Sequence, residues 1–207
     1  NPAGVPLSAI LVGGRRPSTI PLVFEAFSWT HGTFLGSAQA SETTAAAIGK
    51  VGELRRDPMA MLPFCGYNIG DYFAHWLKVG RATTAAQLPR VFYVNWFRKD
   101  DQGRFLWPGF GENSRVLKWI FDRVAGTAPA VETAIGYLPN PADLDTRGLG
   151  LSDDQMAELL RLDVPGWLAE LASIKSHYEK LGDRVPAALK DEAKALEARL
   201  VKLGSAG

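Results

Sequence analysis

Aromatic side chains, with basic ones among them, are concentrated in residues 92–121. Nine of the chain's 21 Phe, Trp and Tyr residues fall in this stretch, together with five Lys or Arg residues. Flat rings next to the start of a helix could hold a planar base, at about 1–3 kcal/mol per stacked contact. Phe105 and Phe110 suit that role, because glycines on both sides of Phe110 expose its ring and let the backbone approach a ligand. Asn113 could hydrogen-bond an edge of the base.

The same aromatic residues also fit a hydrophobic core, and the pattern alone favours the core. If residues 92–97 form a strand, its odd-numbered side chains share one face and its even-numbered side chains share the other. Both faces would then carry rings, as expected for a buried strand. The sequence pattern leaves both interpretations open.

Paired glycines followed by paired arginines form a second candidate site, Gly13-Gly14-Arg15-Arg16-Pro17. The glycines free the backbone after a strand of the buried type, and an arginine at that position can bind phosphate through two parallel hydrogen bonds. A solvated basic turn explains the same residues equally well. The loop is not a Walker A motif, because no G-x-x-x-x-G-K-[ST] pattern occurs in the chain.

The segment from residue 41 to residue 52 has few large side chains. Such a segment can be a packed helical turn, or a loop that becomes ordered only when a ligand is bound. The sequence alone does not choose between the two.

The histidines and the cysteine do not form a recognisable site. His31, His75 and His177 lie far apart, and none has a His, Cys or carboxylate at a metal-binding spacing such as H-x-x-x-H. We interpret His75 as a packed helix residue and Cys65 as a small buried hydrophobic residue. A serine hydrolase is not indicated, because G-x-S-x-G is absent.

Short apolar runs predict that strands and loops position these groups up to about residue 140. We expect strands at 7–12 and 20–24, and a β-hairpin with arms at 91–97 and 104–107 around Asp100-Asp101-Gln102-Gly103. Helices are expected at 70–79 and at 112–124, the second ending at Gly126.

Helix signals dominate the remainder of the chain. Ser152 to Gln155 fits a capping box, Asp163 and Pro165 begin a second helix, and Pro186 begins a third. Apolar stripes are expected on the second helix (Trp167, Leu171, Ile174, Tyr178, Leu181) and on the third (Leu189, Leu196, Leu200, Leu203). The predicted class is α/β: a mixed β-sheet region at 1–150, then a C-terminal cluster of about three helices at 151–207.

Composition is ordinary for a globular protein. The 207 residues are 46% hydrophobic and 22% charged, and the formal net charge is +1. That charge gives no general attraction to nucleic acid or to anionic membranes. No apolar run spans a bilayer, and the first residues do not form a signal peptide, although the chain does not begin with Met. We expect a cytoplasmic protein with no nucleic-acid or membrane partner.

Four stretches resemble GTP-dependent phosphoenolpyruvate carboxykinases, and the likeness extends over essentially the whole chain. The matching stretches are GGRRP at 13–17, DPMAM at 57–61, VNWFRKD at 94–100 and FLWPGFGENSR at 105–115. The resemblance implies that the chain is the C-terminal part of such an enzyme, which converts oxaloacetate and GTP to phosphoenolpyruvate, GDP and CO₂. It implies that residues 1–150 are part of the nucleotide-binding lobe and that 151–207 are its helical subregion.

The resemblance also implies roles for individual residues. The rings of Phe97, Phe105 and Phe110 would enclose guanine, and Gly111, Glu112 and Asn113 would complete that pocket. Arg15 would contact the nucleotide phosphates during transfer. The lid over the site would comprise Ser41, Glu42, Thr43, Thr44, Ala45, Ala46, Ala47, Ile48, Gly49, Lys50, Val51 and Gly52.

The lid departs from the family pattern. Ala47 to Gly52 stand where better-known members carry a Glu-His-Lys-Gly-Lys series, and Ala40 stands where they carry an arginine, so the side chains that hold the lid closed differ here.

The P-loop, the ligands for Mn²⁺ and Mg²⁺ and the oxaloacetate-binding arginines precede this stretch in the family. We therefore expect no metal site in this chain and no activity from it alone. We also expect the full-length protein to be a monomer.

Two other classes of protein fit the residues: a module that stacks single-stranded RNA on the aromatic hairpin, and an interaction fragment whose C-terminal helices bind a partner.

Overall fold

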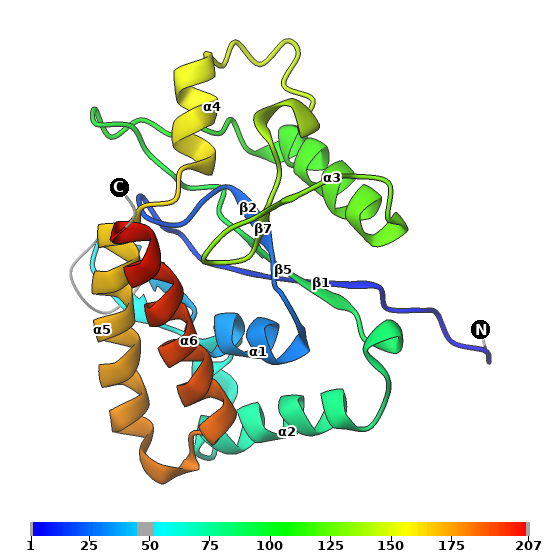
Figure 1. Cartoon of the computed structure of the whole chain (residues 1–207), viewed down its shortest axis with the longest axis vertical. Coiled ribbons are helices and arrows are strands. Elements are labelled where there is room, and N and C mark those ends of the chain that lie inside the picture. The colour runs from blue at the N-terminus through cyan, green and yellow to red at the C-terminus, as the bar shows by residue number, and fades with distance from the viewer. Residues whose placement is uncertain (1, 45–51, 206–207) are drawn as a thin grey trace.

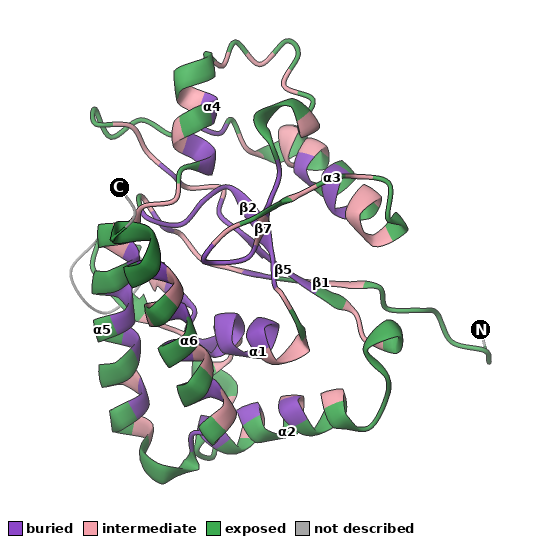
Figure 2. Cartoon of the chain, viewed as in Figure 1, coloured by how far each residue is buried: buried purple, intermediate pink, exposed green. Residues whose placement is uncertain are grey.

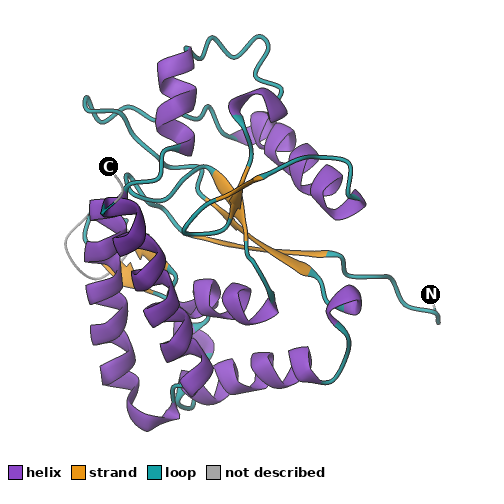
Figure 3. Cartoon of the chain, viewed as in Figure 1, coloured by secondary structure: helices purple, strands orange, loops and turns teal. Residues whose placement is uncertain are grey.

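A computed structural model of the chain describes residues 2–44 and 52–205 and has a mixed β-sheet with helices on both faces (Figures 1 and 3). The main sheet comprises β1 (Ala9–Gly13), β5 (Arg90–Val94), β2 (Val23–Glu25), β7 (Tyr137–Leu138) and β6 (Val131–Glu132), in that spatial order. β1 pairs in parallel with β5, and the other neighbours are antiparallel. A second sheet pairs β3 (Ala40–Glu42) with β4 (Leu54–Arg56).

One face of the main sheet is covered by α1 (Trp29–Ser37), α2 (Ile69–Arg81), α5 (Val164–Leu181) and α6 (Ala187–Gly204). The other face carries α3 (Asn113–Ala125) and α4 (Asp153–Leu160). Strand β5 lies between the two layers, with Val91 and Tyr93 in the first core and Phe92 and Val94 in the second. The buried residues of the helices accordingly lie toward the interior, against the sheet or against a neighbouring helix (Figure 2). The predicted α/β class is confirmed.

Local signals placed the C-terminal helices correctly. Ser152 forms the predicted capping box, accepting from the Gln155 amide at 3.2 Å, and the Asp163 carboxylate caps α5 through the Gly166 amide at 3.0 Å. Gly126 ends α3 in the left-handed conformation at φ 74°. The predicted stripe on α5 faces the core, whereas Leu203, in the last turn of α6, is 46% exposed. No strand follows residue 152 in the described part of the chain.

Helix α1 was missed because nearly all of it is buried. A helix enclosed on every side has no polar face, and therefore none of the periodicity that marks a surface helix. Its N-cap is Ser28, which accepts from the His31 amide at 3.1 Å. A Cβ on Gly32 would lie 2.5 Å from the Cβ of Val91, so α1 packs on β5 more closely than a side chain would allow.

The predicted hairpin at 91–97 and 104–107 is wrong in its arms. Strand β5 ends at Val94, and the pairing lies closer to the turn than predicted: an isolated bridge links Lys99 to Phe105, beside the hydrogen bond from the Leu106 amide to the Arg98 carbonyl oxygen. The side chain of Asn95 bonds to backbone groups of neighbouring segments, and this turns the chain out of the strand. The turn itself is as predicted, with the Gly103 amide 2.9 Å from the Asp100 carbonyl oxygen.

Three smaller predictions also need correction. The first two strands lie at 9–13 and 23–25 rather than 7–12 and 20–24. His75 is exposed on α2, not packed. Cys65 is half-buried rather than buried, and its thiol lies 3.4 Å from the carbonyl oxygen of Tyr67.

Candidate functional site

A cavity of about 390 Å³ opens where the parallel strands β1 and β5 end. Its lining includes Gly14, Arg15, Ser41, Trp96 and Phe97, which come from three separate parts of the sequence. Open α/β sheets bind ligands outside the carboxyl ends of their strands, since loops from neighbouring strands diverge there. The fold therefore brings the glycine–arginine loop, the start of the expected lid and one expected pocket ring to a single site.

The paired glycines let the loop pass between two backbones. A Cβ on Gly13 would lie 2.1 Å from the Val94 carbonyl oxygen, and one on Gly14 would lie 2.3 Å from the Ala40 carbonyl oxygen. Neither obstacle is a flexible side chain. Only glycine at both positions allows the loop to run between β5 and β3.

Arg15 is hydrogen-bonded to β3, the first strand of the small sheet. Its Nε and Nη2 donate to the Glu42 carbonyl oxygen at 3.0 and 2.8 Å, and its amide donates to the Ser41 hydroxyl at 3.1 Å. The Glu42 amide donates back to the Arg15 carbonyl oxygen at 2.9 Å. The two bonds to Glu42 do not use the N–H groups on Nη1, which remain able to donate to an anion. The half-buried side chain is thus not the fully solvated basic turn that the sequence also allowed.

Asn95 holds this loop against the aromatic segment. Its Nδ2 donates to the carbonyl oxygens of Arg16 and Ile20, both at 2.9 Å, and its Oδ1 accepts from the amides of Arg16 at 3.3 Å and Phe97 at 3.2 Å. The side chain is fully buried. No role for Asn95 was predicted from the sequence, although an amide within an otherwise apolar run was a signal for one.

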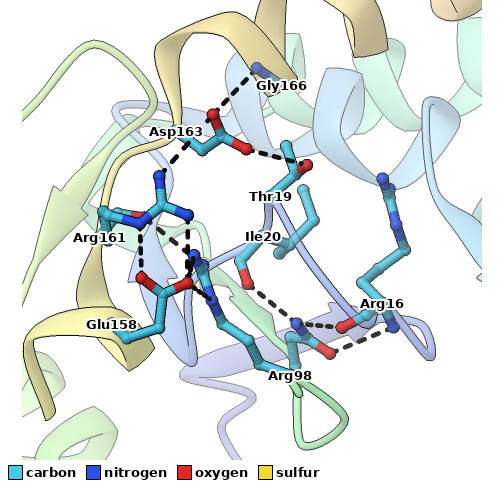
Figure 4. Close-up of polar contacts among 9 residues, drawn as sticks. Arg16, Thr19, Ile20, Arg98, Glu158, Arg161, Asp163 and Gly166 are labelled. Atoms are coloured by element: carbon cyan, nitrogen blue, oxygen red, sulfur yellow. Dashed lines mark hydrogen bonds and ion pairs between the residues drawn. The ribbon is translucent and has the colours of Figure 1, made fainter. Parts of the chain in front are cut away.

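Arg98 anchors the segment that follows. Its side chain is fully buried, and its Nη2 donates to Glu158 Oε1 on α4 at 2.8 Å (Figure 4). Hydrogen bonds from Arg161 and then Arg98 lower the pKa of Glu158 to about 2, against the opposing effect of burial. Glu158 is therefore ionised at neutral pH and fixes both arginines.

Phe97 and Phe105 form an edge-to-face pair, with ring centroids 6.0 Å apart. The Lys99 ammonium lies 5.3 Å from the centre of the Phe105 ring. Phe105 is 58% exposed and Phe97 is half-buried. The rings are thus available to a ligand, and the core interpretation fails for Phe105.

Phe110 is almost entirely in solvent. Its side chain is 97% exposed, and its backbone has φ 49°, a left-handed value that few non-glycine residues adopt. It follows Gly109 at φ 76°, so two consecutive residues with positive φ project the ring away from the protein. The core interpretation is wrong for Phe110 as well. The structure does not bring this ring into contact with the pair formed by Phe97 and Phe105.

The start of α3 continues this surface. Asn113 Oδ1 accepts from the Trp107 indole at 2.9 Å, which fixes the amide and leaves its NH₂ group as the donor. Gly111 is exposed, and its carbonyl oxygen accepts from the Ser114 hydroxyl at 2.6 Å. The Glu112 carboxylate pairs with Arg115.

The expected lid begins and ends on the small sheet. Ser41 and Glu42 belong to β3, and the Thr43 amide donates to the Glu53 carbonyl oxygen at 2.8 Å. The Gly52 amide donates to the Thr43 carbonyl oxygen at 3.1 Å, so the two ends remain paired beyond the strands. Ala45, Ala46, Ala47, Ile48, Gly49, Lys50 and Val51 lie outside the described residues. The described ends of the segment are strand-like rather than helical.

Within 2–44 and 52–205, no group of three or more His, Cys, Asp and Glu side chains is placed to hold a metal ion. No helix in the same ranges is long and apolar enough to cross a membrane.

Comparison with known sequences gives a consistent result. A family model described as "Phosphoenolpyruvate carboxykinase C-terminal P-loop domain" matches residues 1–199. Proteins named "Phosphoenolpyruvate carboxykinase [GTP]" from Treponema pallidum (strain Nichols) and Anaeromyxobacter dehalogenans (strain 2CP-C) are both 56% identical, over 202 and 189 residues, or 97% and 91% of this chain. One from Arthrobacter sp. (strain FB24) is 54% identical over 200 residues, or 97% of the chain. The matches cover 33%, 31% and 33% of those relatives, so the chain spans about a third of their length.

Proposed function

The chain belongs to the family of GTP-dependent phosphoenolpyruvate carboxykinases, and from this premise we propose that it supplies the nucleotide side of that enzyme's active site. The reaction is the decarboxylation and phosphorylation of oxaloacetate by GTP, which yields phosphoenolpyruvate, GDP and CO₂. Because the chain spans a third of its relatives, the activity belongs to the longer protein. We expect the 207 residues alone to be inactive.

One observation carries this proposal: the cavity at the ends of β1 and β5 unites Arg15, Ser41 and Phe97. These three residues come from the segments assigned to phosphate, lid and base. A phosphate-binding group beside an aromatic ring and the start of a lid is the arrangement that nucleotide-dependent transfer requires.

We assign the base to Phe97, Phe105 and Phe110, with Gly111, Glu112 and Asn113 at its edge. The exposure of Phe105 and Phe110 supports this, because apolar rings left in solvent are free to stack on a ligand. The free NH₂ group of Asn113 can donate to the O6 or N7 acceptor of guanine, a contact that adenine's amino group at the same edge would weaken.

We assign Arg15 to the phosphates. Its guanidinium is held by Glu42 through one side of the fork, and Nη1 can donate to a phosphate oxygen. A fixed positive charge beside the transferred phosphoryl group stabilises the charge that develops in the transition state.

We assign the lid to residues 41–52, based on the small sheet. Since Arg15 binds the Glu42 carbonyl oxygen, the phosphate-binding side chain and the base of the lid form a connected unit. Closure would exclude water and protect the enolate intermediate from protonation to pyruvate.

The described residues do not fit the Mn²⁺ and Mg²⁺ of the family. No three ligating side chains meet among them, so no step is assigned here to a metal held by this chain. Oxaloacetate, phosphoenolpyruvate and CO₂ as partners, a monomeric state and a cytoplasmic location remain predictions. The RNA-binding alternative is not favoured, since the family match points to the carboxykinase and the net charge is only +1.

The proposal is tested by binding and turnover in the intact carboxykinase. GDP should quench tryptophan fluorescence at much lower concentration than ADP, and oxaloacetate should be converted to phosphoenolpyruvate with GTP but not with ATP. The Arg15→Ala variant should bind GDP while losing turnover. Equal use of ATP and GTP would refute the assigned guanine pocket, and salt-sensitive binding of single-stranded RNA without GDP binding would favour the RNA-binding module.

A further inference from the structure

Glu170 is a buried carboxylate on α5 that no role described so far uses. Its side chain is 8% exposed, and it pairs with two arginines. Arg16 donates to both of its oxygens, at 2.9 and 2.7 Å, and Arg56 Nη1 lies 2.8 Å from Oε1. Arg16 and Glu170 are 154 positions apart in the sequence.

Arg16 connects Glu170 to the phosphate-binding loop. It directly follows Arg15, and its side chain is only 5% exposed. Asn95 fixes its backbone on both sides, through the Arg16 amide and carbonyl groups. The orientation of Arg15 therefore depends on a neighbour that both Glu170 and Asn95 hold in place.

Arg56 connects Glu170 to the base of the lid. It is the last residue of β4, the strand that returns from the lid, and its side chain is 11% exposed. Besides Glu170, it donates to the Ala38 carbonyl oxygen and to the Ser173 hydroxyl at 3.3 Å. The return strand of the lid is thus fixed to α5, while its partner strand β3 is held by Arg15.

The charges of the three side chains are coupled, because Glu170 pairs with both arginines out of water. Burial alone would raise the pKa of Glu170, but the hydrogen bond and charge of Arg16, with Arg56, bring it below its usual value. Burial lowers the pKa of Arg56, against the attraction of Glu170. Removing the carboxylate would leave two arginines close together with little solvent and no counter-charge.

We propose that Glu170 is a positioning residue that holds the Arg15 loop and the base of the lid as one rigid unit. This inference rests on the proposed function, because it assigns Glu170 to the same site. Through Arg16 it sets the direction of Arg15, and through Arg56 it fixes β4, the strand that returns from the lid. Chemistry and lid closure would therefore respond together when this carboxylate is lost, while the aromatic rings on another segment would not.

The first test uses two single variants of α5, each of which replaces a glutamate by glutamine. Glu170→Gln removes the buried charge, and Glu179→Gln makes the same change at an exposed position of the helix. Both are compared with the wild-type intact carboxykinase, at a temperature well below each melting transition. We expect Glu170→Gln to lower kcat by roughly tenfold to a hundredfold and to raise the share of pyruvate in the product. The dissociation constant for GDP should stay within about threefold, and Glu179→Gln should match the wild type.

A second pair of variants separates positioning from folding. Arg56→Gln should lower kcat as Glu170→Gln does. Arg56→Lys should retain part of the activity, because an ammonium group keeps the charge but not the forked guanidinium that also reaches Ala38 and Ser173. Arg147→Gln, at a side chain that is 91% exposed and lies outside the small sheet, is the control. If Glu170→Gln does not fold, the two Arg56 variants test the proposal instead.

Amide hydrogen exchange provides a readout that does not depend on activity. The Glu42 amide donates to the Arg15 carbonyl oxygen, and the amides of Thr43 and Asp57 donate across the base of the lid. In Glu170→Gln, these three amides should exchange at least about tenfold faster than in wild type. The exchange rates of the β5 amides should change only as much as the global stability of the variant changes. A uniform change across the protein, or wild-type kcat and product ratio in a folded variant, would overturn the proposal. Absence of GTP-dependent turnover in the wild type would instead refute the proposed function, while the exchange result would still stand.

Discussion

Truncating Phe110 separates a binding role from a packing role more clearly than any other change in this chain. The side chain is 97% exposed, so replacing Phe110 with Ala removes almost no buried surface and creates no cavity. If the ring stacks on the base, its loss should cost about 1–3 kcal/mol of nucleotide binding, or roughly 5- to 150-fold in affinity. The stability of the protein should hardly change.

The backbone of Phe110 sharpens the prediction. At φ 49° a residue with a Cβ is strained, by about 1–2 kcal/mol relative to glycine. Phe110→Gly should therefore be as stable as the wild type, or more stable by up to about 1 kcal/mol, although some of that gain is offset by the entropy of a freer chain. It should nevertheless bind nucleotide as weakly as Phe110→Ala. A variant that gains stability while losing affinity is difficult to explain by packing.

The measurements are a GDP titration followed by tryptophan fluorescence, and a thermal denaturation, both on the intact carboxykinase. Phe121→Ala is the matched control, because Phe121 is 70% exposed on the nearby helix α3 but outside the assigned pocket. Phe92→Ala is the packing comparison, since its fully buried ring should cost about 3–5 kcal/mol of stability. A fall in melting temperature like that of Phe92→Ala, with GDP affinity unchanged, would refute the stacking role of Phe110.

Three further predictions concern the lid, the glycine loop and a buried histidine. Deleting residues 43–51 from the intact enzyme should leave GTP binding nearly unchanged and divert product to pyruvate; loss of nucleotide binding without pyruvate, seen by calorimetry and product analysis, would contradict the lid assignment. Gly14→Ala should lower kcat and shift the base of the lid, because the added Cβ would lie 2.3 Å from the Ala40 carbonyl oxygen. Wild-type kinetics in this variant would show that the loop moves to accommodate the methyl group. Burial and then the charge of Arg199 lower the pKa of His31 to about 3, below its unfolded value, so the stability it confers is present above about pH 6.5 and lost as the pH falls toward 3. Between pH 7 and 5 this loss should reach about 2 kcal/mol in denaturant unfolding and be absent in a folded His31→Gln variant.

The parts of this protein that follow from its sequence are those with local causes. The capping box at Ser152, the cap at Asp163 and the stop at Gly126 depend on hydrogen bonds and dihedral angles within a few residues, and all three formed as predicted. The alternation of β5 follows in the same way from the geometry of an extended chain. The resemblance of the GGRRP, DPMAM, VNWFRKD and FLWPGFGENSR stretches to the carboxykinases was sufficient to indicate the family.

What the tertiary structure decided depends on contacts between distant segments. Helix α1 is enclosed on all sides, so its sequence carries no stripe, and β5 ends early because Asn95 bonds to a loop about 79 positions away. Whether Phe105 and Phe110 face the core or solvent could not be read from their types, because a ring suits either place and the surrounding chain sets its exposure. The junction of Arg16, Arg56 and Glu170 has no local signal at all: its charges look like surface residues in the sequence, and only folding removes them from water and makes each the partner of the others.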